Sequence, residues 1–268
     1  MKANQRQAGH YAKNRSSRRS SPAPAPYASK VKQRRPKRDN RYYSLSNLGK
    51  DDYNILHSCS GVNIMYFRPG LHKEAGLSFS PIKAIISPRP IGWVSSRGKD
   101  GSVNLAPYSY FNAISELPPM VMFSSAPSGN GQHKDSLRNV IETEEFVVNV
   151  VSSDLCDAMN ITSNGLAYGQ NEFTAAGLDM AECHSVSVPR VAASPAALEC
   201  KLWKVIELPK PEHNNAGVMV IGIITGIHIA DNVITDGKVD VTRYQPLARL
   251  GYMDYARVTD IFAMARPK

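Results

Sequence analysis

Two stretches of the chain gather side chains that suit a ligand with a ring and a phosphate. Residues 89–112 combine amides and hydroxyls (Asn104, Ser109, Asn112) with proline and aromatic residues, which suits a flat, partly apolar ring. Residues 123–136 supply hydroxyls, glycines, a lysine and the start of a predicted helix. Unpaired N–H groups at a helix N-terminus bind anions, and a neighbouring lysine strengthens such a site. We therefore predict ring contacts in the first stretch and phosphate contacts in the second.

Other kinds of active site lack their sequence signatures. The chain contains no G-x-S-x-G motif, no G-x-G-x-x-G motif after a predicted strand and no G-x-x-x-x-G-K-[ST] motif. These absences exclude the common serine hydrolase motif and both standard nucleotide-binding motifs. His133 is interpreted as a solvated residue at a helix start, in preference to a base or a metal ligand. We predict no catalytic acid, base or nucleophile.

The four cysteines are Cys59, Cys156, Cys183 and Cys200. They form no C-x-x-C pair and have no spacing typical of zinc, so we predict free thiols in a reducing compartment and no metal site. No apolar run reaches the ~18–20 residues that span a bilayer, and no apolar signal-peptide core follows the basic N-terminus. The expected protein is soluble and cytoplasmic, without a membrane span.

Hydrophobic patterning predicts many strands and few helices. Turns recur at short intervals, and the alternating helices of a doubly wound parallel sheet are missing, so we predict a mainly β fold: an antiparallel barrel with a few peripheral helices. A loop-rich stretch is expected at 163–197, and 239–256 closes the domain. The expected strands are 82–88, 91–96, 120–125, 145–151, 197–208 and 217–230.

One clear helix is predicted at 133–144. Leu137, Val140 and Ile141 recur at the spacing of one helical face, and Asp135 or Ser136 is expected to cap the first turn. A shorter helix is predicted at 152–162. The longer helix would place its N-terminus beside the serines that end the strand at 120–125.

The first fifty residues differ from the rest in charge and composition. Residues 1–50 contain fourteen Lys or Arg and one acid, whereas 51–268 carry a net charge of −4. The tail also contains the Pro/Ser-containing run at 20–26, and we expect 1–50 to be disordered. It is interpreted as a solvated extension or as a basic arm for nucleic acid or acidic membrane. The mildly acidic remainder argues against a broad nucleic-acid-binding face there.

Several motifs in the same order resemble one known family. The segment "SPRPIGWVSSRGKDGSVNLAPYSYFNAISELPPMVMFSS" is followed by "HKDSLRN", "EFVVNVV", "ALECKLWKVIELP" and "ARLGYMDYA". This pattern resembles the flavin reductase-like family of FMN-binding split barrels over residues 65–268. The resemblance implies a six-stranded split β-barrel that binds FMN non-covalently and forms a homodimer with the flavin near the subunit interface.

The resemblance also implies an activity. A family member of this kind would be an NAD(P)H-dependent flavin reductase, with NADH or NADPH as co-substrate, that supplies reduced flavin to a monooxygenase. Because the cofactor carries the reactive chemistry, hydride transfer is consistent with a site that has no predicted catalytic acid, base or nucleophile. Two alternatives stay open: an FMN-containing electron-transfer protein without a nicotinamide site, and a flavin-binding protein that its tail tethers to nucleic acid.

The resemblance implies twelve cofactor contacts. Two hydroxyls end the first motif strand near the flavin, five residues follow the isoalloxazine ring and ribityl chain, and five gather at the ribityl-phosphate end. In that order they are Ser95 and Ser96; Asn104, Ala106, Pro107, Tyr108 and Ser109; Ser124, Ser125, Lys134, Asp135 and Ser136.

Some of these residues also have a purely structural interpretation. Tyr108 could pack in the barrel interior or a dimer interface, and Ser124 and Ser125 could simply finish a strand. Trp93, within the first motif, is interpreted as a core residue. Lys134 has the strongest functional interpretation, because the adjacent helix amides already favour an anion.

Overall fold

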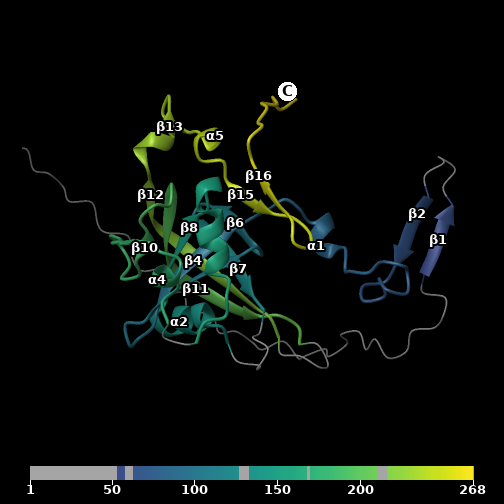
Figure 1. Cartoon of the computed structure of the whole chain (residues 1–268), viewed down its shortest axis with the longest axis horizontal. Helices are drawn as coiled ribbons and strands as arrows, with labels where there is room; N and C mark the ends of the chain where they lie inside the picture. Colours follow the sequence, from purple (N-terminus) through teal and green to yellow (C-terminus); the bar gives the residue numbers. More distant parts are fainter. Residues whose placement is uncertain (1–52, 58–62, 127–132, 168–169, 211–215, 268) are drawn as a thin grey trace, which may run out of the picture. The chain divides into compact units, whose positions relative to one another are not determined.

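The computed structural model describes residues 53–57, 63–126, 133–167, 170–210 and 216–267 (Figure 1). The chain divides into two units, Met1–Arg41 and Tyr42–Lys268, and all described residues belong to the second. The predicted basic tail at 1–50 lies outside the described residues, so its predicted disorder stays a prediction. Among the described residues, no helix is both long and apolar enough to cross a membrane.

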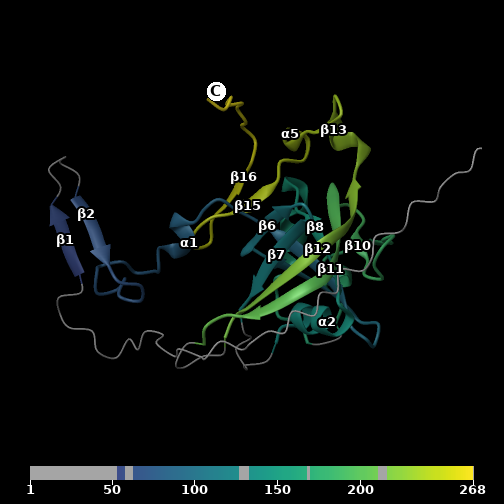
Figure 2. The same cartoon turned by 180° about the vertical axis from the view of Figure 1, so that it is seen from behind.

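The centre of the molecule is a seven-stranded antiparallel sheet (Figures 1 and 2). Its strand order is β5-β4-β8-β11-β12-β7-β6, which confirms the predicted mainly β architecture. The sheet has one strand more than the resemblance implies, because β6 pairs back onto β7 at one edge. The strands are β4 Gly92–Arg97, β5 Val103–Tyr108, β6 Phe111–Glu116, β7 Pro119–Ser125, β8 Glu145–Val150, β11 Ala196–Glu207 and β12 Val218–Ile229.

The sheet curls so that its two ends share one core. The ring of Tyr108, at the end of β5, lies 4.8 Å from the ring of Phe123 in β7, and the Phe146 ring of β8 lies 5.5 Å from Phe123. The backbone N–H of Ser124 donates to the carbonyl of Tyr110 at 2.8 Å, which extends the pairing of β6 with β7 to the residue that precedes β6. Apolar residues from both ends of the sheet are therefore buried in one shared core, and this burial stabilises the barrel.

Helix α2 (Asp135–Thr143) packs against β4, β5, β8 and β11. Leu137 and Val140 are buried, as their spacing predicts, whereas Ile141 is 40% exposed. The predicted cap is wrong: Lys134 is the N-cap residue and makes no side-chain cap bond. Asp135 instead pairs with Arg138, and the Ser136 hydroxyl accepts a hydrogen bond from the amide of Asn104.

Shorter elements surround the sheet. They comprise β1 Tyr53–His57, β2 Asn63–Phe67, α1 Ile82–Ile85, β3 Arg89–Pro90, η2 Ser153–Leu155, α3 Cys156–Ile161, α4 Glu172–Ala175, β9 Met180–Ala181, β10 Arg190–Val191, η3 Asp231–Val233, β13 Ile234–Thr235, β14 Lys238–Val239, α5 Val241–Tyr244, β15 Leu247–Arg249 and β16 Tyr255–Arg257. The helices are thus few and short, as predicted.

The strand prediction at 82–88 is wrong, because this stretch contains the helical turn α1. The backbone N–H groups of Ala84 and Ile85 both donate to the carbonyl of Pro81, so the apolar run closes a turn instead of pairing with a strand. Arg89, itself only 5% exposed, donates to the carbonyls of Lys83 and Ile86 and fixes that turn. A run of apolar residues alone does not distinguish these two outcomes.

Candidate functional site

A pocket of about 570 Å³ opens beside the start of α2. Its wall comes from β5, from the residues that begin α2, from the segment at 162–167 and from α4. The lining residues are Asn104, Ala106, Pro107, Tyr108, His133, Lys134, Asp135, Ser136, Arg138, Thr162, Ser163, Asn164, Gly165, Leu166, Ala167 and Glu172.

Seven of the twelve residues implied by the resemblance line this pocket. Four belong to β5 and three stand at the start of α2, so the structure brings together the two stretches predicted to bind one ligand. The seven are Asn104, Ala106, Pro107, Tyr108, Lys134, Asp135 and Ser136. Their assignment as cofactor contacts stays a prediction.

The other five implied residues do not line the pocket. Ser95 is fully buried and donates to the carbonyl of Pro189 at 2.7 Å, whereas Ser96 accepts from the amide of Asn139 at 3.2 Å. Ser124 donates to the carbonyl of Val218 at 3.3 Å, within the sheet. The remaining two are Ser109, which follows β5, and Ser125, which is 1% exposed at the end of β7.

Two buried amides hold α2 against the hairpin formed by β4 and β5. The side-chain amide of Asn104 donates to the Ser136 hydroxyl at 2.7 Å, and the amide of Asn139 donates to the Ser96 hydroxyl at 3.2 Å. These contacts lie one helical turn apart on α2. They fix the helix N-terminus, with its unpaired N–H groups and partial positive charge, at the pocket wall.

The hydroxyl of Tyr108 is buried and has no hydrogen-bond partner among the described residues. Burial raises the pKa of Tyr108, although the nearby hydroxyls of Ser136 and Ser125 act in the opposite direction. Buried hydroxyls are normally paired, because an unpaired one loses its bonds to water without replacement. The hydroxyls of Ser136 and Ser125 are the polar neighbours of this group.

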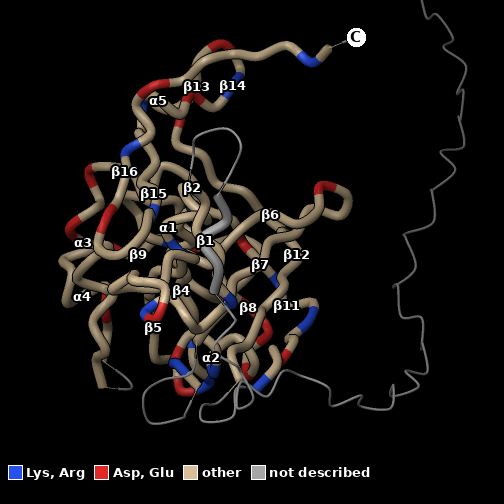
Figure 3. The backbone as a smooth tube through the Cα atoms, turned by 90° about the vertical axis from the view of Figure 1, so that its right-hand side faces the viewer, with Lys and Arg blue, Asp and Glu red and all other residues tan. Residues whose placement is uncertain are grey.

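Charges of both signs surround the entrance of the pocket. Lys134 is exposed, and its ammonium lies 6.0 Å from the centre of the Tyr108 ring. Asp135 and Arg138, which also line the pocket, form an ion pair at 2.9 Å. Figure 3 shows Lys/Arg and Asp/Glu positions intermixed along the backbone around α2.

The segment at 162–167 was not identified from the sequence, although it forms one side of the pocket. The indole N–H of Trp93 donates to the Thr162 hydroxyl at 2.8 Å, and that hydroxyl donates to the carbonyl of Met159 at 2.7 Å. Trp93 is fully buried, which confirms its interpretation as a core residue. It also holds the first residue of this segment in place.

Glu172 is the second contribution that sequence analysis missed. Its carboxylate accepts from the backbone N–H of Leu105 at 3.1 Å, and its residue is 5% exposed. Burial raises the pKa of Glu172, an effect that the backbone hydrogen bond from Leu105 partly offsets. No motif in the loop-rich stretch marked this residue. His133, interpreted as a solvated residue, is exposed and also lines the pocket.

The comparison with known proteins shows the family. Residues 86–249 match the "Flavin reductase like domain", and the chain belongs to this family. It is 35% identical over 182 residues to the uncharacterized protein BH2278 of Halalkalibacterium halodurans, which covers 68% of this chain and 87% of that protein. The matched region contains both the pocket and the sheet.

Solved structures agree with this assignment. Nitrilotriacetate monooxygenase component B from Bacillus cereus aligns with a TM-score of 0.65 at 32% identity, covering 70% of this chain and 98% of that one. The 2-nitrobenzoate 2-nitroreductase NbaA of Pseudomonas fluorescens aligns with a TM-score of 0.62 at 31% identity, covering 79% and 96%. A Shewanella frigidimarina protein with a split barrel domain shares the fold at 21% identity, with a TM-score of 0.61 and coverage of 69% and 90%.

A flavin, the cofactor of this family, suits the donor set of the pocket. The volume lies within the range of about 300–1,000 Å³ usual for small-molecule sites. Ala106, Pro107 and the ring edge of Tyr108 offer apolar wall, while Asn104 and Ser136 offer polar groups. The α2 N-terminus and Lys134 suit an anionic end.

Proposed function

We propose that the protein binds FMN non-covalently in the pocket beside α2 and catalyses hydride transfer from NADH or NADPH to flavin. The observation that carries this proposal is the joint wall of β5 and the α2 N-terminus, in a chain of the flavin reductase-like family. This wall combines an apolar strand surface with a helix N-terminus, a structure suited to bind anions, around one cavity.

Each group has a role that follows from its chemistry. Bound flavin supplies the hydride-accepting ring. Lys134 and the N–H groups of α2 bind the phosphate, while Pro107 and Ala106 support the ring plane. Asn104 and Ser136 hold each other and the ribityl chain. The protein contributes position and electrostatic stabilisation, so no catalytic acid or base is assigned.

We further propose that the protein forms a homodimer. The support is a set of exposed apolar side chains, among them Leu117 at 91%, Met253 at 82% and Ile85 at 75%. Such surfaces in water favour association, and a two-fold dimer is the commonest closed assembly. Light scattering should give the mass of two chains at micromolar concentration, and the mass of one chain would contradict this.

The partner that receives reduced flavin is proposed to be a flavin-dependent monooxygenase. One structural relative is named a monooxygenase component and another a nitroreductase, so acceptor assays should include both a monooxygenase system and 2-nitrobenzoate. The expected cytoplasmic location stays a prediction, and a nucleic-acid role for the basic tail stays an open alternative to a solvated extension.

The activity is tested by mixing FMN-loaded, full-length protein with NADH or NADPH under anaerobic conditions in a stopped-flow spectrophotometer. The oxidised-flavin absorbance should bleach with at least one nicotinamide, faster than for free FMN at the same concentration. If the flavin stays oxidised with both nucleotides but accepts electrons from dithionite, the electron-transfer alternative without a nicotinamide site replaces this proposal.

A further inference from the structure

A buried carboxylate, Glu199, lies outside the pocket, on the face of strand β11 that points away from the barrel core. Leu198 and Cys200 face the barrel core, so the intervening Glu199 points to the outer face of the sheet. The segment at 183–191 covers it there, and Val186 and Val188 pack against Val147 and Ala197. Glu199 is 1% exposed, although it lies on the outer face.

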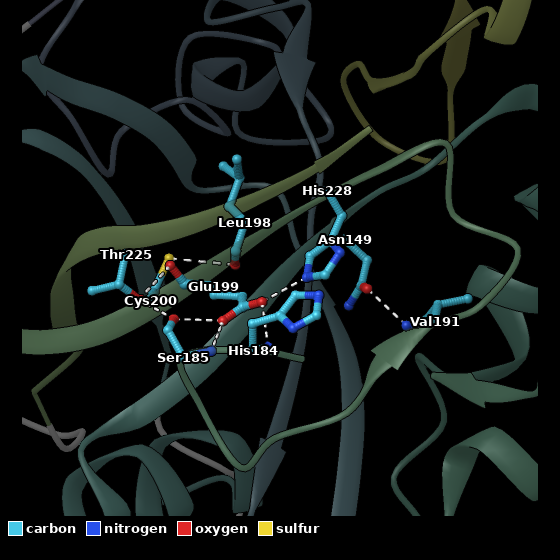
Figure 4. A network of polar contacts seen from close by, with 9 residues as sticks. All are labelled: Asn149, His184, Ser185, Val191, Leu198, Glu199, Cys200, Thr225 and His228. Atoms are coloured by element: carbon cyan, nitrogen blue, oxygen red, sulfur yellow. Dashed lines mark hydrogen bonds and ion pairs between the residues drawn. The ribbon is translucent and has the colours of Figure 1, made fainter. Parts of the chain in front are cut away.

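The carboxylate of Glu199 is held by four hydrogen bonds (Figure 4). One oxygen accepts from the backbone N–H of His184 at 2.8 Å and meets Nε2 of His228 at 2.6 Å. The other accepts from the backbone N–H and the hydroxyl of Ser185, both at 2.5 Å. Across β12, a Cβ at Gly226 would come within 2.9 Å of the carboxylate carbon, so the glycine leaves the space that Glu199 occupies.

Cys183 completes a set of three different metal-binding side chains. The ligand atoms of Cys183, Glu199 and His228 all lie within 4.8 Å of one another. They come from three segments: the covering loop, β11 and β12. The ring of His184 stacks on that of His228, with centroids 5.6 Å apart at 15°, and restrains its orientation.

We propose that Cys183, Glu199 and His228 bind one Zn²⁺ ion. A thiolate, an imidazole and a carboxylate are the three ligand types that zinc uses, at about 2.0–2.3 Å each. Two ligands of one tetrahedral ion lie about 3.5 Å apart, so Cys183 must move closer to the other two ligands by up to about 1 Å. Nε2 of His228 and the Glu199 oxygen, which are 2.6 Å apart, must separate by about 1 Å to admit the ion. Cys183 stands on the covering loop, which can supply its part of this adjustment.

The ion replaces the direct contact between His228 and Glu199. His228 binds as a neutral imidazole, and the thiol proton of Cys183 leaves to solvent as the sulfur–zinc bond forms, without electron transfer. The N–H donors of His184 and Ser185 remain on the carboxylate and orient it, as outer partners do at metal sites. Three protein ligands leave a fourth position for water.

An entry path is available on the side of the cysteine. Cys183 also lines a second pocket of about 410 Å³, together with Arg97, Met180 and Glu182. Burial, together with the nearby charge of Glu199, raises the pKa of Cys183 to about 11, although Arg190 acts in the opposite direction. None of the three proposed ligands lines the pocket beside α2, so the inference does not depend on the proposed flavin chemistry.

The direct test is metal binding to the full-length protein after treatment with a chelator. Zn²⁺ titrated against a chromophoric competitor should bind at one ion per chain, and Co²⁺ should give tetrahedral bands at wavelengths beyond those of oxidised flavin. Cys183→Ser should weaken Zn²⁺ binding at least tenfold. Cys156→Ser, at a partly exposed cysteine outside the set, is the matched control and should bind like the wild type.

A second measurement uses the wild type alone. Saturating Zn²⁺ should slow alkylation of Cys183 at least tenfold and leave the alkylation of Cys156 unchanged, as followed by peptide mass. The proposal is overturned if no stoichiometric ion binds, if Cys183→Ser binds Zn²⁺ as tightly as the wild type, or if Zn²⁺ fails to protect Cys183. These readouts involve no nicotinamide and no flavin reduction, so they fail independently of the reductase proposal.

Discussion

The pocket beside α2 and the cluster around Glu199 differ in the number of hydrogen-bond partners that their buried polar groups have. In the pocket, the Tyr108 hydroxyl is buried without a partner among the described residues. In the cluster, each oxygen of Glu199 has two partners. Buried polar groups are expected to be paired, so an unpaired one indicates a contact still to be made.

This difference separates two kinds of binding. A ligand in the pocket adds bonds to groups that lack them, and it gains from them without breaking bonds inside the protein. An ion in the cluster must replace the His228–Glu199 contact, which already stabilises the fold. Removing polar groups from the cluster should therefore reduce stability first, whereas removing them from the pocket should reduce ligand binding first.

The largest effect is expected from Glu199→Ala, measured in the presence of a chelator. The substitution leaves the N–H groups of His184 and Ser185 and the ring of His228 without their acceptor. Leaving buried donors without their acceptor costs about 1–3 kcal/mol per group, so the free energy of unfolding in urea should fall by about 3 kcal/mol or more.

The matched control is Glu207→Ala, an exposed glutamate on the same strand, which should change stability by less than about 0.5 kcal/mol. FMN affinity of the folded Glu199→Ala protein should match the wild type. If the two substitutions cost the same, the cluster does not stabilise the fold and the comparison fails.

The pH dependence of stability should follow from the same carboxylate. Burial alone raises the pKa of Glu199, but the hydrogen bonds from His184, Ser185 and His228 outweigh burial and lower it from 4.5 to about 2. Because the folded pKa lies below the unfolded one, its contribution is complete above about pH 4.5 and is lost as the pH falls towards 2. Urea unfolding of the wild type should show this loss.

Glu199→Gln is the control for the pH experiment, because it removes the titrating group and keeps the size of the side chain. Its difference in stability from the wild type should shrink as the pH falls through this window. A difference that stays constant from pH 5 to pH 2.5 would assign the acid sensitivity to other carboxylates.

A smaller effect is expected from Lys134→Ala, and it should concern binding and not folding. A charge-assisted contact to phosphate contributes about 1.5–3 kcal/mol, so FMN should bind roughly ten- to a hundredfold more weakly. Riboflavin, which lacks the phosphate, should be affected much less. Lys99→Ala, at an exposed lysine in the turn between β4 and β5, is the control. Equal losses for FMN and riboflavin would remove Lys134 from the phosphate site.

The sequence predicts local elements better than it predicts which of them meet. Period and length suffice for β4, β7, β8, β11, β12 and α2, because each buries a regular pattern of apolar residues. The stretch at 82–88 was assigned wrongly, since a continuous apolar run has no period to separate a strand from a helical turn. The hairpin of β1 and β2 was not predicted, because the change in composition indicated that the folded region begins at about residue 65, within β2.

The residues of the pocket beside α2 also fall into a predicted and an unpredicted group. The side of the pocket formed by β5 and α2 could be predicted, because its residues lie in two continuous motifs. Thr162 and Glu172 could not, since they reach the pocket only through contacts with Trp93 and Leu105, which are distant in sequence. The cluster of Cys183, Glu199 and His228 was not predicted for the same reason. Its three residues are far apart in the sequence, and only the fold brings them together.

The smallest and sharpest effect is expected from Tyr108→Phe. The substitution removes a hydroxyl that has no partner among the described residues and keeps the ring packed against Phe123. The free energy of unfolding of the flavin-free protein should therefore stay within about 0.5 kcal/mol of the wild type or rise. If the hydroxyl contacts FMN, affinity for FMN should fall by about fivefold, as the loss of roughly 1 kcal/mol implies. Tyr244→Phe, at a half-buried tyrosine outside the pocket, should leave FMN affinity unchanged. A Tyr108→Phe protein that is less stable without flavin but binds FMN normally would place this hydroxyl with the structural groups, as in the cluster, and would remove the contrast between the two regions.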